Sequence, residues 1–159
     1  MAEITIYTDG AAKGNPGNGG YGTVLLSGKF RKELSQGFRL TTNNRMELWA
    51  VIAGLETLKT AGNKITIYSD SKYVVDSVEK GWVFNWLRNN FKDKKNKDLW
   101  LRFLDTYKKQ VVNFIWVKGH AGNVENERCD KLAVQASEKQ NLLIDKAYEE
   151  SKKEPKSLF

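Results

Sequence analysis

Two aspartates each end a segment of almost the same sequence. Residues 4–9 read Ile-Thr-Ile-Tyr-Thr-Asp and residues 65–70 read Ile-Thr-Ile-Tyr-Ser-Asp, so Asp9 and Asp70 occupy equivalent positions of one pattern. Two carboxylates held side by side repel each other unless a proton or a cation lies between them. The chemistry that this pair could perform is therefore the binding of a cation.

Glu47 and Asp130 are two further acids that lack a balancing charge on their own predicted helices. Positions three and four residues away from either acid hold no cation, although these are the positions that face it on a helix. A capping-box glutamate three residues after an N-cap at Asn44 is a second interpretation of Glu47, and the two interpretations are compatible. An unpaired carboxylate in a dry site would cost several kcal/mol.

Alternating β-branched residues make residues 4–9 and 65–70 β-strands. A strong helical pattern lies between them, so they can be parallel neighbours joined by a crossover. Asp9 and Asp70 would then lie together at the carboxyl edge of the sheet, where α/β sheets bind ligands. The glycine-rich residues 10–20 are expected to form a loop. Gly17, Gly19 and Gly22 match a dinucleotide fingerprint, but a strand follows them instead of the required helix, so we reject that site.

The other elements complete an α/β fold. Residues 21–27 and 30–40 are predicted strands, residues 45–59 a largely buried helix, and residues 111–117 a strand buried on both faces. Further helices are expected after Ser71, from Asp98, and over 124–138. The order predicts a five-stranded mixed sheet, with three antiparallel strands and then two parallel ones, flanked by helices. Residues 1–138 are expected to form a single catalytic domain, followed by a mixed-charge C-terminal tail at 139–159.

This topology would let the four acids converge at one rim of the sheet. Oxygen ligands alone select hard divalent ions, Mg²⁺ or Mn²⁺, over zinc. His120, the only histidine, lies in a glycine-flanked loop. A lone loop histidine is more often a surface residue than a functional one, and the residues themselves leave its role open.

Charge and composition limit the class of protein. The net charge is +7, which suggests a polyanionic partner. Several cations at 88–97 follow tryptophans, a pattern that fits either a solvated loop or a nucleic-acid surface. No apolar run could span a membrane, no leader precedes the first strand, and the single cysteine agrees with a reducing compartment. A cytoplasmic protein is expected.

Several motifs are similar to those of one family, in the family's order. They are Thr-Asp-Gly at 8–10, Gly-Asn-Pro-Gly at 14–17, Gly-Gly-Tyr-Gly at 19–22, Thr-Thr-Asn-Asn-Arg-Met-Glu at 41–47, Ser-Asp-Ser at 69–71, Trp82 with Asn85-Trp86, Val-Lys-Gly-His-Ala-Gly at 117–122 and Asn-Glu-Arg-Cys-Asp at 126–130. Over residues 3–138 the chain resembles bacterial ribonuclease H of type 1, of the ribonuclease H-like superfamily. The resemblance implies an endonuclease that cuts the RNA strand of RNA/DNA hybrids with two Mg²⁺ ions and leaves 5′-phosphate and 3′-hydroxyl ends.

The resemblance also assigns roles to single residues. The family's metal-binding carboxylates match Asp9, Glu47, Asp70 and Asp130, and its flexible-loop histidine, thought to assist proton transfer or product release, matches His120. Positions that contact the RNA strand match Asn15, Asn43 and Glu47, and those that contact the DNA strand match Thr42, Asn44 and Trp82. The segment 88–97, with Arg88, Lys94 and Lys95, resembles a basic protrusion that enlarges the substrate surface. Lys72 departs from the family, which commonly has glutamine there.

Two other functions stay open from the sequence. One is a ribonuclease H domain of the reverse-transcriptase type or a related integrase-like nuclease, although Met1 directly before the first strand favours a free-standing enzyme. The other is a noncatalytic module that binds hybrid or double-stranded RNA through the basic surface and would not require the four acids. A monomer is expected, and no protein partner is implied.

Overall fold

The computed structural model describes residues 2–119 and 123–153 of the chain. The elements follow one another as β1 (Glu3–Lys13), β2 (Gly17–Ser27), β3 (Phe30–Thr41), α1 (Asn43–Glu56), β4 (Lys64–Ser69), α2 (Lys72–Glu79), α3 (Trp82–Arg88), α4 (Lys97–Tyr107), β5 (Val111–Trp116), α5 (Val124–Ser137) and α6 (Lys146–Ser151). Within these residues no helix has both the length and the apolar character needed to cross a lipid bilayer.

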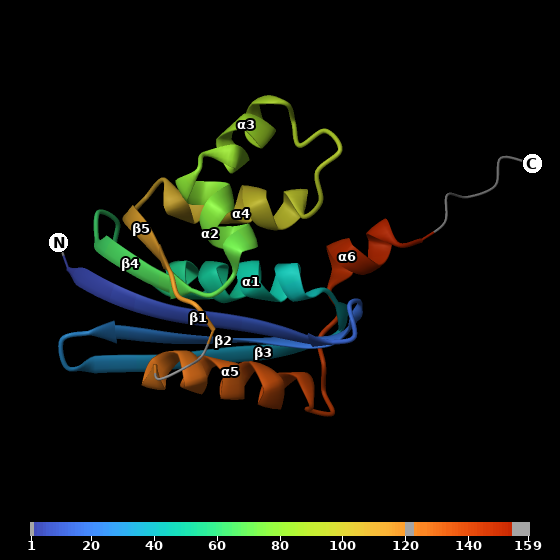
Figure 1. Ribbon diagram of the computed structural model, residues 1–159, viewed down its shortest axis with the longest axis horizontal. Helices are drawn as coiled ribbons and strands as arrows, with labels where there is room; N and C mark the ends of the chain where they lie inside the picture. The colour runs from blue at the N-terminus through green and yellow to red at the C-terminus, as the bar shows by residue number, and fades with distance from the viewer. Residues whose placement is uncertain (1, 120–122, 154–159) are drawn as a thin grey trace, which may run out of the picture.

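The predicted sheet is confirmed. Its strands lie in the order β3-β2-β1-β4-β5, with antiparallel pairs among the first three and parallel pairs from β1 to β5. Figure 1 shows α5 on one face of this sheet and α1 on the other, with α2, α3 and α4 beyond α1. Tyr7 pairs with Tyr68 in the parallel register of β1 and β4, which brings Asp9 next to Asp70.

The expectation of a loop over residues 10–20 is confirmed only for the turn at residues 14–16 and is wrong for the rest. Strand β1 continues four residues past Asp9, and β2 begins at Gly17. A Cβ added to Gly10 would lie 2.3 Å from the backbone nitrogen of Glu47, and one added to Gly22 would lie 2.3 Å from the carbonyl oxygen of Cys129. The glycines therefore mark strands that two helices approach more closely than any side chain allows.

The close approach at Gly22 predicts a large loss of stability on substitution. Gly22→Ala should lower the free energy of unfolding by about 3 kcal/mol, because the added methyl group overlaps the backbone of α5 and the packed layers must separate. Urea denaturation measures the change. Asn18→Ala, at an exposed position of the same strand, should alter it by less than about 0.5 kcal/mol. Equal losses in the two variants would contradict the steric explanation.

Helix α1 is buried on nearly all sides, as its apolar sequence predicts. Its N-cap is Thr42, whose hydroxyl accepts a hydrogen bond from the backbone N–H of Arg45 at 3.2 Å. Arg45, and not Glu47, is therefore the third residue of the helix. The capping-box interpretation of Glu47 is wrong, and its burial needs another explanation.

Strand β5 is less buried than predicted. Val111 is 61% exposed and Trp116 is 40% exposed, whereas Phe114 is buried. The reason is its place at the edge of the sheet, where β4 is its one partner among the described strands. The apolar residues on both faces of this strand therefore did not mean that both faces are buried.

The segment after α5 packs against the rest of the domain. Leu143 forms a bridge with Phe38 of β3, and Tyr148 of α6 is 7% exposed. Asp145 is buried and binds the guanidinium of Arg45, with 2.7 Å between its Oδ2 and Nε. These contacts place α6 beside the start of α1 (Figure 1).

Candidate active site

Three of the four predicted acids converge. Asp9, Glu47 and Asp70 each present a carboxylate oxygen, and these three oxygens all lie within 4.8 Å of one another. Asp9 comes from β1, Glu47 from α1, and Asp70 from the residue after β4. The parallel register of β1 and β4 aligns the aspartates, and the missing side chain of Gly10 lets α1 bring Glu47 down onto them.

Glu47 and Asp9 are both buried, each with 4% of its surface exposed, whereas Asp70 is half-buried. Burial raises the pKa of Glu47 well above its usual range, and the negative charges of Asp9 and Asp70 raise it further. Its Oε2 is buried and has no hydrogen-bond partner among the described residues. Asp9 is oriented by the N–H of Gly10, which donates to its Oδ1 at 3.0 Å.

This arrangement fits a hard divalent cation. A buried carboxylate oxygen without a partner costs free energy that a bound ion would recover, and the two charges acting most strongly on Glu47 repel it. The donors are all carboxylate oxygens, which Mg²⁺ and Mn²⁺ prefer over softer ligands. The group can therefore hold a metal ion, in agreement with the interpretation of the sequence.

The group of three does not include Asp130, the fourth predicted acid. Asp130 is half-buried on α5 and is not among the three acids whose oxygens lie within 4.8 Å of one another. Its helix packs on β1 and β2, and the thiol of Cys129 donates to the carbonyl oxygen of Tyr7 at 3.2 Å. His120 lies outside the described residues.

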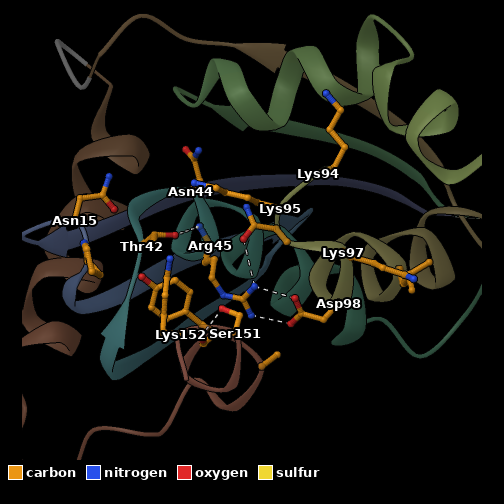
Figure 2. Close-up of a pocket in the computed structure, with 15 residues that line it drawn as sticks. Asn15, Thr42, Asn44, Arg45, Lys94, Lys95, Lys97, Asp98, Ser151 and Lys152 are labelled. Atoms are coloured by element: carbon orange, nitrogen blue, oxygen red, sulfur yellow. Dashed lines mark hydrogen bonds and ion pairs between the residues drawn. The ribbon is translucent and has the colours of Figure 1, made fainter. Parts of the chain in front are cut away.

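Five of the predicted substrate residues line one cavity of about 900 Å³. They are Asn15, Thr42, Asn44, Lys94 and Lys95. Figure 2 shows that they come from separate parts of the chain: the turn after β1, the start of α1 and the loop before α4. Asn43 does not line the cavity, but its backbone N–H donates to Oδ1 of Asn15 at 3.1 Å.

The remaining predicted substrate residues lie outside this cavity. Trp82 is 42% exposed at the start of α3, and Arg88 at the end of that helix donates to the side chain of Asn85. The ammonium of Lys72 lies 4.7 Å from the ring centroid of Trp116. The structure thus separates the cavity near the start of α1 from Lys72 on α2 and from Trp82 and Arg88 on α3.

Sequence reasoning missed Trp116. Its indole N–H donates to the carbonyl oxygen of Asp70 at 3.1 Å, and the ammonium of Lys72 lies over its ring. Trp116 therefore contacts both Asp70, a candidate metal ligand, and Lys72, the residue that departs from the family pattern. The available signal was its position at the end of a strand predicted to lie parallel to the strand before Asp70.

Comparison with curated proteins gives long alignments at high identity. The sequence model of the family described as RNase H matches residues 1–138. The ribonuclease H of Trichodesmium erythraeum is 57% identical over 152 residues, covering 92% of this chain and 96% of the relative. The ribonuclease HI of Synechocystis is 49% identical over 151 residues, covering 91% and 94%.

Solved structures share the fold. LC9-RNase H1, described as a type 1 RNase H with the type 2 active-site motif, superposes with a TM-score of 0.79 at 29% identity, covering 95% of this chain and 81% of that one. LC11-RNase H1, solved in complex with an RNA/DNA hybrid, gives a TM-score of 0.64 at 27% identity, covering 91% and 99%.

Proposed function

Because the chain belongs to the ribonuclease H family, we propose that it hydrolyses the RNA strand of RNA/DNA hybrids and leaves 5′-phosphate and 3′-hydroxyl ends. The observation that carries this proposal is the group of three carboxylates built around the buried Glu47. A module that only bound nucleic acid would gain nothing from acids that repel one another in a buried site. The solved relative bound to a hybrid supports the substrate class.

In this proposal Asp9, Glu47, Asp70 and Asp130 would hold two Mg²⁺ ions, which Mn²⁺ can replace. Such ions lower the pKa of a bound water and neutralise the leaving 3′-oxygen. The chain supplies fixed ligands: Gly10 orients Asp9, and the packing of α1 against β1 keeps Glu47 shielded from bulk water. His120 would assist proton transfer or product release.

Recognition of the hybrid would use the 2′-hydroxyl, which distinguishes RNA from DNA across a minor groove. The amides of Asn15 and Asn43, together with Glu47, would contact the RNA strand, because short amides donate and accept hydrogen bonds. Thr42, Asn44 and Trp82 would contact the DNA strand. Arg88, Lys94 and Lys95 would add contacts with phosphates. The same proposal places the enzyme in the cytoplasm as a monomer.

The decisive experiment compares three labelled duplexes of one sequence: RNA/DNA hybrid, duplex DNA and duplex RNA. Each is incubated with the protein with and without Mg²⁺, and the products are sized and their ends identified. We expect internal cuts in the RNA strand of the hybrid only, and only with the metal ion. Cutting of the DNA strand, or cutting with EDTA present, would exclude the proposed function.

Lys72 gives this enzyme a substrate contact of a different kind from the family's glutamine. An ammonium can bind a phosphate but cannot accept a hydrogen bond. The Lys72 ammonium lies over the ring of Trp116, whose indole N–H donates to the backbone of Asp70. Lys72→Gln should therefore weaken hybrid binding and reduce the salt slope, the dependence of log Kd on log salt, by about 0.9. Fluorescence anisotropy without divalent ions measures both quantities. Lys64→Gln, at the opposite end of β4, is the control, and equal slopes for the two variants would refute this role.

A further inference from the structure

One wall of the 900 Å³ cavity is formed by the C-terminal segment, outside the motifs that resemble the family. Helix α6 and the residue after it contribute Ala147, Tyr148, Ser151 and Lys152. The opposite wall carries Lys94, Lys95 and Lys97, and the start of α1 lies between the two walls. In Figure 2 the Lys152 side chain extends from its end of the cavity toward the level of Asn15 and Thr42.

This wall is held in place by ionic contacts. Arg45 is 3% exposed and binds Asp145 at 2.7 and 2.9 Å, directly before α6. Thr41 donates its hydroxyl to the same carboxylate at 2.8 Å. Arg39 of β3 makes two hydrogen bonds to Glu149 at 2.9 and 2.8 Å. These contacts anchor α6 to the domain, and with it the backbone at Lys152.

The cavity is strongly basic. Among the described residues its lining contains four lysines and Arg45 but only one acid, Asp98. The negative charge of Asp98 is balanced by Arg45. Burial alone would raise the pKa of Asp98, but two hydrogen bonds from Arg45 outweigh this effect and hold the pKa below its usual value. Among the lysines, Lys97 donates to Asn90 at 2.9 Å and Lys94 lies 5.4 Å from the ring of Trp86. The ammonium of Lys152 likewise lies 5.4 Å from the ring of Tyr148, on the same wall. Lys95 is the lysine of the lining for which no such contact is found within the described residues.

We propose that Lys152 makes the end of α6 the outer wall of a phosphate-binding groove for the DNA strand of the substrate, facing Lys95 across the cavity. The inference rests on the proposed function, because the strand is assigned through Thr42 and Asn44, which line the same cavity. A lysine ammonium donates hydrogen bonds to phosphate oxygens, whereas the Ser151 hydroxyl already donates to the carbonyl oxygen of Tyr148 at 2.6 Å. The groove would extend substrate binding beyond the sites shared with the family.

The test uses the full-length protein with Lys152→Ala and Lys153→Ala. Lys153 is the neighbouring residue, but it lines a different cavity with Arg39 and Lys146, so it controls for the loss of a charge. Hybrid binding is measured by anisotropy without divalent ions over a range of salt concentrations. Losing one phosphate contact should lower the salt slope by about 0.9 and weaken binding roughly eightfold near 0.1 M salt. Lys152→Arg should restore both values, and Lys153→Ala should match the unmodified protein.

Hybrids shortened from either end, on one strand at a time, identify the strand that is bound. The difference between the unmodified protein and Lys152→Ala should disappear when the DNA strand is shortened and persist when only the RNA strand is shortened. The reverse pattern, or equal salt slopes for Lys152→Ala and Lys153→Ala, overturns the inference. Both results leave the proposed function intact, because that is judged separately by cleavage of the hybrid by the unmodified protein.

Discussion

Asp70→Asn should reduce hydrolysis of the RNA strand by roughly a thousandfold or more, because metal ions supply several kcal/mol of transition-state stabilisation. The asparagine keeps the size of the side chain but removes one of three charges whose oxygens lie within 4.8 Å of one another. Binding of the hybrid should persist, since the basic surfaces are untouched. Single-turnover cleavage with Mg²⁺ and anisotropy without it measure the two effects.

The same substitution has a second readout that does not depend on activity. Without divalent ions the three acids repel one another, so Asp70→Asn should raise the melting temperature of the ion-free protein. Added Mg²⁺ should then stabilise the variant less than it stabilises the unmodified protein. Asp76→Asn is the control, because Asp76 lies on α2 and pairs with Lys80. Full cleavage by Asp70→Asn, or equal stabilisation by Mg²⁺, would show that these acids do not bind the ion.

Asp145→Asn should lower the free energy of unfolding by about 3 kcal/mol, the lower end of the cost of removing one partner from a buried ion pair. Arg45 and Asp145 are 3% and 4% exposed, and the pair joins α1 to the C-terminal segment. The cost is at the lower end because Asp98 also binds Arg45, with 2.7 Å between the nearest atoms.

Urea denaturation measures this loss, and the chain offers a matched surface pair. Asp105 lies 3.6 Å from Lys108 and is 75% exposed. Asp105→Asn should change the free energy of unfolding by less than about 0.5 kcal/mol. If Asp145→Asn were as stable as Asp105→Asn, the C-terminal segment would not be anchored through Arg45.

Local patterns were sufficient for most of the fold. The alternation in residues 4–9 and 65–70 predicted two parallel neighbours, and the register of β1 and β4 confirms it. The helix start after Ser71 was also predicted correctly, and the Ser71 hydroxyl caps that helix by accepting from the N–H of Val74 at 3.2 Å. The glycines at 10 and 20 misled because each is required by a helix from elsewhere in the chain, packed against the strand there, and not by a loop.

By itself the sequence determined the order of strands and helices and placed Asp9, Glu47 and Asp70 on elements that could meet, because periodicity and caps act over a few residues. Only the tertiary structure decided how closely these acids approach and that Glu47 is buried. It also decided that Asp145 reaches Arg45, 100 residues away in the chain. Burial and charge contacts depend on packing between distant segments, which no local pattern contains. For that reason Lys152 became a candidate for substrate binding only once α6 was seen beside α1.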